Sequence, residues 1–301
     1  MEQWLSDWCL AHLGTAPVEV LFEVRQVSTV HGLRLEDGRK VVVKARPDDD
    51  RAESCVAAQS QLAERGFPCA RPLTPAVAVG SLAVHAEEYR PGGEVISGDS
   101  PEVATRYAEV FALLLATLEA ISVKPPLPNP RWLRWDHQDP GLWPAIDFLD
   151  ERDQRLVPEE VTKTADRARR RLLAADLPNV LGHGDFEAQN LRWDINGGWT
   201  VHDWDSLAWQ PEAALAGAAS GMFPSTIPPT LAPIESSAAF LESYQDFRGR
   251  RFSQAEQEVA WAASVWPAAH NARWEALHGD PQICGEALRE QEAERLRLAN
   301  A

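Results

Sequence analysis

The chain contains few lysines and few cysteines. It has four lysines against 25 arginines, so a lysine inside an apolar segment is not easily dismissed as background. The cysteines show neither the paired spacing of a disulfide framework nor the spacing of a metal site. They therefore indicate a reducing compartment in which the thiols stay free. The four are Cys9, Cys55, Cys69 and Cys284.

Two features of secreted and membrane proteins are also missing. The first four residues lack the basic stretch and the long apolar run of a signal peptide. No segment has the uncharged length that a membrane-spanning helix needs. We therefore expect a soluble, cytoplasmic protein with no membrane partner.

Positive charge is scarce relative to negative charge, and the formal net charge is −16 at pH 7. Nucleic acid is disfavoured as a partner, because contacts to phosphates require a basic patch. Cationic small molecules stay open as substrates. A simpler interpretation is that the scattered acidic residues keep the surface solvated. The arginine-rich run at residues 167–171 is expected on the outer face of a helix.

The hydrophobic pattern predicts a strand-rich region followed by a helical one. The 301 residues, 45% of them hydrophobic, are enough to fill two cores. Ser100 with Pro101 is expected to start a core helix, Ser253 a long helix, and the chain beyond residue 205 to be helical. Before residue 91, the pattern predicts a helix at 3–13, strands at 20–27, 30–35 and 40–45, a helix capped by aspartates 48–50 and ending at 66, and a strand at 82–89.

The most informative segment is Leu-Gly-His-Gly-Asp-Phe-Glu-Ala-Gln-Asn at residues 181–190, followed by His-Asp-Trp-Asp at 202–205. A short hairpin between them, closed by Asn-Gly-Gly at 196–198, is expected to fold Asp203 back towards Asp185. His-Gly-Asp alone is a weak signal, because turns favour Gly and Asp for backbone reasons. The later Asn and Asp make the pattern specific.

These residues suit phosphoryl transfer, in which the protein must position and neutralise a charged group. Asp185 could accept the proton of an attacking hydroxyl. Asn190 and Asp203 are hard oxygen ligands of the kind that Mg²⁺ prefers. Lys44 follows the apolar run 41–43. Its ammonium would supply a positive point charge to the α- and β-phosphates of the phosphoryl donor.

A strand lysine, a loop Asp, an Asn and a later Asp, in this order, resemble the aminoglycoside phosphotransferase and choline kinase-like family of small-molecule kinases. The resemblance implies an α+β, protein-kinase-like fold with two lobes. A β-rich nucleotide-binding lobe would span residues 1–91, and a mainly helical catalytic and substrate-binding lobe residues 92–301. ATP and Mg²⁺ would be the cofactors, and backbone groups near Glu88 and Arg90 would contact the adenine.

Two parts of the nucleotide site depart from kinases. Residues 26–32 hold no repeated glycines, so backbone groups and the hydroxyl of Ser28 or Thr29 would cover the phosphates, although Ser28 is equally well explained as a turn residue. Kinases also pair the strand lysine with a helix glutamate. Glu53 is the best placed acid to pair with Lys44, and an exposed first-turn glutamate stabilised by the helix dipole is the alternative.

The acceptor is less defined than the reaction. The family often has His-Pro-Gly where this chain has Glu-Ala-Gln at 187–189, and an acid where it has Glu-Ala-Ala-Leu-Ala at 212–216. The expected acceptor is a small molecule with a hydroxyl group, with a cationic antibiotic leading and a metabolic alcohol, amino sugar or sugar as the alternative. Trp274 would either wall the substrate pocket or pack against another helix.

Two rival functions belong to other classes. One is an ATP-binding regulatory module without transfer activity, suggested by the missing glycine loop and the uncertain Glu53. The intact Asp185, Asn190 and Asp203 argue against it. The other is an iron-binding oxygenase site built on His183 and Asp185 with a later histidine. Such a site normally lies on a closed all-β scaffold.

Overall fold

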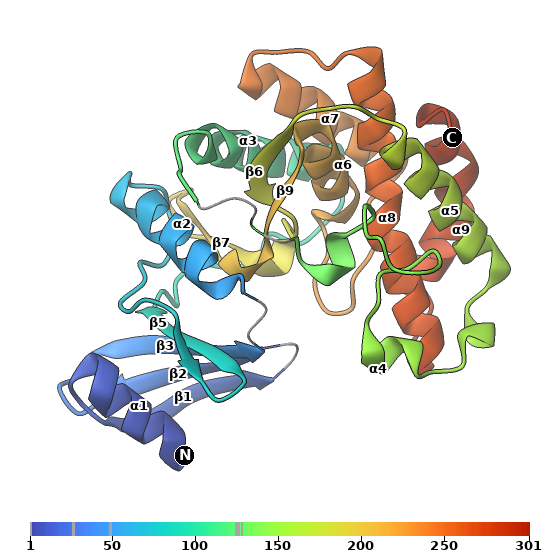
Figure 1. Cartoon of the computed structure of the whole chain (residues 1–301). Coiled ribbons are helices and arrows are strands. Elements are labelled where there is room, and N and C mark those ends of the chain that lie inside the picture. Colours follow the sequence, from blue (N-terminus) through green and yellow to red (C-terminus); the bar gives the residue numbers. More distant parts are fainter. Residues whose placement is uncertain (1, 26–27, 48–49, 124–126, 128) are drawn as a thin grey trace. The chain divides into compact units, whose positions relative to one another are not determined.

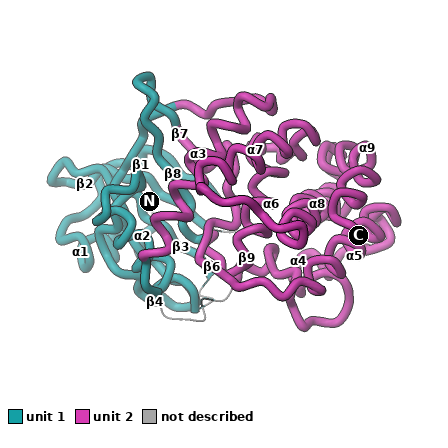
Figure 2. The backbone as a smooth tube through the Cα atoms, turned by 90° about the horizontal axis from the view of Figure 1, so that it is seen from above, with its two compact units in different colours: residues 1–93, 121–128, 193–205 teal, residues 94–120, 129–192, 206–301 magenta. Residues whose placement is uncertain are grey.

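The computed structural model describes residues 2–25, 28–47, 50–123, 127 and 129–301 (Figure 1). It divides into two compact units, coloured separately in Figure 2. A small antiparallel sheet and a larger helical part confirm the predicted α+β fold class. The first unit comprises residues 1–93, 121–128 and 193–205, and the second residues 94–120, 129–192 and 206–301.

The first unit contains a five-stranded antiparallel sheet with the strand order β1-β2-β3-β5-β4. Four of these strands match the predicted ones apart from their ends, and the short β4 was not predicted. Residues 26 and 27, at the predicted end of the first strand, lie outside the described residues. The strands are β1 (Pro17–Arg25), β2 (Thr29–Leu35), β3 (Lys40–Pro47), β4 (Val77–Val79) and β5 (Leu82–Glu88).

Side-chain alternation gives the central strands two different faces. On β3, Val41 and Val43 belong to an apolar cluster covered by α1 (Gln3–Leu13), the predicted N-terminal helix, whereas Lys44 alternates with them. The apolar side chains thus fix the face on which the polar ones lie. The cluster contains Leu5, Trp8, Cys9, Leu33, Leu35, Val41, Val43, Ala45, Val84 and Ala86.

Helix α2 (Ala52–Glu64) follows β3 and ends, as predicted, just before Gly66, which has a left-handed φ of +81°. Its N-cap is Arg51, which makes no capping hydrogen bond with its side chain. The prediction of an aspartate cap is therefore wrong for Asp50, whose own φ is 62°. Residues 48 and 49 lie outside the described residues.

The second unit is mainly helical. Ser100 caps α3 by accepting a hydrogen bond from the Val103 N–H, and Ser253 forms a capping box with Glu256 at the start of α8, so both predicted helix starts are confirmed. Within the described ranges, no helix combines the length and the apolar character needed to cross a membrane. The helices are α3 (Pro101–Leu118), α4 (Asp147–Asp150), α5 (Glu159–Leu173), α6 (Glu212–Met222), α7 (Ile234–Arg248), α8 (Gln254–His278) and α9 (Ile283–Leu298), with short 3₁₀ turns η1 (Arg131–Leu133), η2 (Gln154–Leu156), η3 (Ala188–Asn190) and η4 (Trp204–Ser206).

Two small sheets frame the predicted motif. Strands β7 (Leu191–Trp193) and β8 (Trp199–Val201) form the expected hairpin sheet. Strand β6 (Asn179–His183) pairs with β9 (Leu207–Pro211), so the expectation that everything beyond residue 205 is helical was wrong. The short β9 gains its conformation from pairing with a distant strand, which local propensity does not reveal.

Helices α6 and α8 pack with their backbones in close approach. Helix α6 is buried at every residue from Ala213 to Met222. A Cβ added at Gly217 would lie 2.0 Å from the carbonyl oxygen of Ala260, and one at Gly221 would lie 2.7 Å from that of Ser264. The two glycines therefore allow α8 to lie directly against α6.

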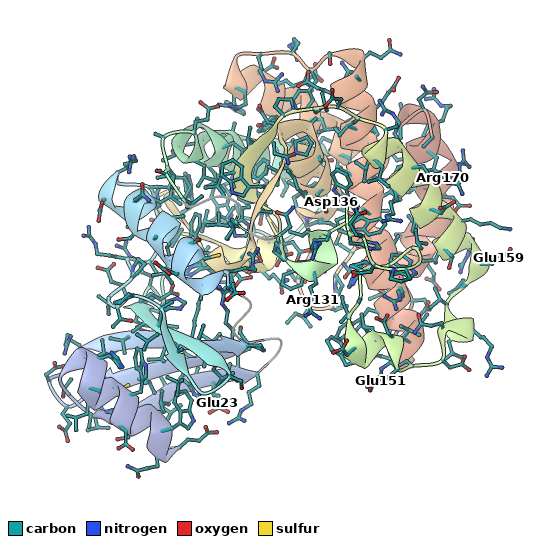
Figure 3. All side chains as sticks on the ribbon, in the orientation of Figure 1. Glu23, Arg131, Asp136, Glu151, Glu159 and Arg170 are labelled. Atoms are coloured by element: carbon teal, nitrogen blue, oxygen red, sulfur yellow. The ribbon has the colours of Figure 1, made fainter. Side chains whose placement is uncertain are left out.

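The arginine-rich run on α5 faces two ways. Arg167 and Arg170 are exposed, as predicted, and Arg170 is labelled on α5 in Figure 3. Arg169 and Arg171 are half-buried, so the outer-face prediction was wrong for these two. Arg169 donates to the backbone carbonyls of Trp135 and His137, and Arg171 pairs with Glu258 at 2.8 Å.

Candidate active site

The motif at 183–190 begins where β6 ends. The N–H of Gly184 donates to the Ser206 carbonyl at 2.8 Å, which continues the pairing with β9 by one residue. A Cβ at Gly184 would lie 1.9 Å from Cδ1 of the Leu133 side chain and 3.3 Å from the backbone oxygen of Ser206, so a larger residue would require Leu133 to move. The backbone just before Asp185 is therefore held in place at the end of β6.

Asp185 and Asn190 are held together by hydrogen bonds. Asn190 Nδ2 donates to the Asp185 carbonyl oxygen at 2.9 Å and to its carboxylate Oδ2 at 3.1 Å. The turn is closed by the Glu187 N–H, which donates to the Asp185 carbonyl at 3.1 Å. Because the amide nitrogen of Asn190 is used in these bonds, its amide oxygen is the atom suited to a metal ion.

Phe186 anchors this loop in the core of the second unit. Its ring lies 4.8 Å from that of Phe111 and 6.2 Å from that of Tyr107, centroid to centroid. His183 is buried beside Phe186, and its Nδ1 accepts a hydrogen bond from the Asp185 N–H at 3.3 Å. His183 therefore stabilises the backbone at Asp185.

A pocket within the second unit opens beside Asp185. Two carboxylates, those of Asp185 and Glu187, line it together with the ring of Trp132 and the side chains of His270 and Asn271 on α8. The Glu187 side chain is only 6% exposed. The other lining residues are apolar apart from Gly184, so the pocket combines negative charge and polar groups with apolar surface.

His270 is a neutral polar residue of this pocket. Burial lowers the pKa of His270 to about 4, and the charge of Arg273 adds to that effect. The imidazole is therefore uncharged at neutral pH. Its Nε2 is buried without a hydrogen-bond partner among the residues that the structure describes. A buried nitrogen of this kind can stabilise a ligand by a hydrogen bond.

Trp274 packs elsewhere on α8. It contacts a small apolar cluster of Ile146, Leu149 and Leu277, and its ring meets Phe148 edge-on at 5.6 Å. The tryptophan that lines the pocket is Trp132. These contacts favour the packing interpretation of Trp274, and its role in substrate binding stays a prediction.

In the first unit, Lys44 lies on the face of the sheet opposite the apolar cluster. Its Nζ is 3.4 Å from Oε1 of Glu87 on β5, and both side chains are buried. Burial alone would lower the pKa of Lys44. The carboxylates of Glu87, Asp205 and Asp203 outweigh burial and raise that pKa, so the ammonium stays charged.

Asp203 and Asp205 are the two other carboxylates that act on Lys44 in the first unit. Asp203 has a φ of 59°, a left-handed conformation that is uncommon outside glycine and is frequent at functional positions. Asp205 Oδ1 lies 3.1 Å from Nη1 of Arg46, and its carbonyl accepts from Nη2 of Arg51 at 2.6 Å. Burial would raise the pKa of Asp205, but Arg46 and Lys44 outweigh it and lower the pKa.

Glu53 is exposed in the first turn of α2, as the helix-dipole alternative expected. Lys44 instead pairs with Glu87, because β5 runs beside β3 whereas Glu53 lies early in its helix. A role of Glu53 in binding the nucleotide stays a prediction. Ser28 is half-buried just before β2, and its role at the phosphates stays a prediction.

Glu88 and Arg90 form an ion pair with each other at 2.9 Å. The N–H of Glu88 donates to the carbonyl of Arg71 at 2.9 Å. An adenine contact at this strand end would therefore use other backbone groups, and it stays a prediction.

Sequence reasoning missed Glu87, Asp205, Glu187 and His270. For Glu87 a signal existed, since His85 and Glu87 are polar residues alternating with apolar ones along a strand, which places both on one face. Glu187 and His270 lie more than eighty residues apart, and nothing local to either indicates that they line one pocket.

The family model described as "Phosphotransferase enzyme family" matches residues 25–252. No curated protein matches the sequence. An amicoumacin kinase solved in complex with AMP-PNP, Ca²⁺ and Ami is 12% identical, with a TM-score of 0.68, and the match covers 99% of this chain and 94% of that one.

Two further solved structures have the same fold. An aminoglycoside phosphotransferase from Alicyclobacillus acidocaldarius is 14% identical, with a TM-score of 0.56 and coverage of 96% and 93%. A choline/ethanolamine kinase family protein from Mesorhizobium loti is 17% identical, with a TM-score of 0.57 and coverage of 98% and 99%. The predicted protein-kinase-like fold is thereby confirmed.

Proposed function

The chain belongs to the phosphotransferase enzyme family. We propose that it transfers the γ-phosphoryl group of ATP to a hydroxyl group of a cationic small molecule, with Asp185 as the catalytic base. Asp185 accepts the proton of the acceptor hydroxyl. The observation that carries this assignment is the position of Asp185, which is held by Asn190 and lines the pocket beside it.

The other predicted residues bind the nucleotide. Lys44 contacts the α- and β-phosphates, and its buried, charged ammonium supports that role. Asn190 and Asp203 are ligands of Mg²⁺, which their amide and carboxylate oxygens fit. Bound there, Mg²⁺ would offset the negative charge of the phosphate oxygens.

The acceptor is a hydroxylated, cationic small molecule. Two pocket carboxylates would attract amines, Trp132 would cover an apolar face or the cation, and His270 would bind a polar group. An antibiotic is the leading candidate, supported by the likeness to an aminoglycoside phosphotransferase and to an amicoumacin kinase. A metabolic alcohol, amino sugar or sugar is the second candidate, supported by the likeness to a choline/ethanolamine kinase family protein.

Use of ATP and the four free, buried cysteines support a cytoplasmic location. The iron-oxygenase rival loses its support, because it was tied to an all-β scaffold and the fold is that of kinases.

A screen for ADP release tests the function. Purified protein with ATP and Mg²⁺ is offered aminoglycosides, peptide antibiotics and macrolides in one panel and choline, ethanolamine, amino sugars and neutral sugars in another. Turnover is expected with a cationic member, and it should disappear in Asp185→Asn. Turnover confined to neutral sugars would contradict the cationic acceptor. ATP binding without turnover on either panel would favour the regulatory module.

A further inference from the structure

Lys44 obtains its carboxylate partner from a strand. Glu87 is 4% exposed and lies on β5, which pairs with β3 in the register Lys44 to His85 and Val42 to Glu87. Its Oε1 lies 3.4 Å from Nζ of Lys44. Both side chains therefore project from neighbouring strands of one hydrogen-bonded ladder.

Helix α2 contributes a neutral side chain, that of Gln59, which forms a hydrogen bond with the same carboxylate. Gln59, 1% exposed, donates through Nε2 to the other carboxylate oxygen of Glu87, at 2.8 Å, and to the carbonyl of Ala70, also at 2.8 Å. His85 Nε2 lies 4.0 Å from that same carboxylate oxygen. The two oxygens of Glu87 thus have separate partners, one cationic and one on α2.

We propose that Glu87 and Gln59 are positioning residues for Lys44, with the β5 carboxylate holding the ammonium in place of a helix glutamate and Gln59 fixing the orientation of that carboxylate. The inference rests on the proposed function, in which Lys44 contacts the phosphates. In protein kinases the glutamate lies on a mobile helix, and the helix position controls activity. Here the pair lies within the sheet, so a shift of α2 would break the Gln59 hydrogen bond and leave the ion pair intact.

Nucleotide affinity gives the first test. Glu87→Gln keeps the shape and removes the charge, and titration calorimetry with ATP and Mg²⁺ should show affinity weakened by about tenfold or more. Glu19→Gln is the control, because it removes a carboxylate from the same sheet that pairs with exposed Arg34. Thermal unfolding of each variant is measured in parallel. Glu87→Asp, which retains the charge, takes the place of Glu87→Gln if that variant does not fold.

Chemical labelling tests the ion pair without nucleotide. With so few lysines, acylation at Lys44 can be followed by mass spectrometry against exposed Lys163. Glu87→Gln should raise the labelling rate of Lys44 relative to Lys163, because the amine loses its anionic partner. A wild type that neither binds ATP nor transfers phosphate would refute the proposed function, and labelling would still decide whether Glu87 positions Lys44.

A charge exchange completes the test. Combining Glu87→Gln with Gln59→Glu returns one carboxylate to the cluster from the helix side, and it should recover part of the lost ATP affinity and slow the labelling of Lys44. Unchanged labelling and ATP affinity in Glu87→Gln would overturn the proposal. An equal loss in Glu19→Gln, or a change in unfolding temperature alone, would overturn it as well.

Discussion

The two units hold their functional carboxylates by different means. In the first, buried charges of opposite sign pair with one another across several elements, as in Lys44 with Glu87 and Arg46 with Asp205. In the second, Asp185 accepts hydrogen bonds from a nearby asparagine and lines a pocket whose histidine is neutral. Replacing a charged residue in the first unit therefore leaves a buried charge without its partner. Replacing a residue in the second unit mainly changes the groups that the pocket presents to a ligand.

The largest effect is expected at Asp185. Asp185→Asn keeps the shape of the side chain but removes the proton acceptor, so the turnover number should fall by a factor on the order of a hundred or more. ATP affinity should change little. Steady-state kinetics measures the turnover number, and titration with ATP measures the affinity. Glu159→Gln is the control, because it removes an exposed charge from the same unit. Wild-type turnover in Asp185→Asn would show that this carboxylate is not the base.

The neutrality of His270 can be tested through the pH dependence of stability. Its pKa is lowered to about 4 in the folded protein, so between pH 6.5 and pH 4 the unfolded chain binds a proton that the folded chain does not. Stability should therefore fall as pH falls through this window. Between pH 7 and pH 5, the free energy of unfolding of His270→Gln should fall by about 2 kcal/mol less than that of the wild type.

Urea unfolding at the two pH values measures this difference. His85 and His31, whose pKa values are also lowered by burial, contribute equally to both proteins and cancel. Identical losses would mean that His270 is charged or exposed in the folded state.

The charge balance of the first unit is tested at Asp203. Asp203→Ala should weaken Mg²⁺-dependent ATP binding by more than about tenfold, and more than Asn190→Ala does, because a carboxylate offsets the charge of the ion and an amide does not. Calorimetry with and without Mg²⁺ compares the variants. Asp203→Ala that binds ATP as tightly as wild type with Mg²⁺ would refute the ligand assignment.

The smallest effect is expected at Glu187. Glu187→Gln should raise KM for a cationic acceptor by roughly fivefold, because it removes one of the two acidic residues that line the pocket and leaves the other in place, and it should leave KM for ATP unchanged. Kinetics with a cationic acceptor and a neutral analogue measure the split. Equal changes for both acceptors would show that Glu187 shapes the pocket without recognising charge.

The same contrast explains what the sequence could predict. Asp185 and Asn190 lie five residues apart in one loop, so their proximity follows from local spacing, and helix starts such as Ser100 and Ser253 follow from capping chemistry. Strand Lys44 could be recognised from its apolar run.

The partner of Lys44 could not be assigned with the same certainty. Glu87 meets Lys44 only because β3 and β5 pair, and the helix rule borrowed from kinases pointed to Glu53. The pocket likewise depends on the tertiary packing that brings His270 on α8 to the loop of Asp185, which no local pattern encodes.

The glycines of α6 have a consequence for how acceptor preference can evolve. Gly217 and Gly221 let the backbone of α8 lie against α6 at Ala260 and Ser264, so this stretch of the helix pair depends on the absence of side chains at the two positions. His270 and Asn271 lie beyond that contact and line the pocket. Substitutions at 270 and 271 can therefore alter selectivity while the scaffold is retained, whereas substitutions at the two glycines would be removed by selection for folding before any new acceptor could be tried.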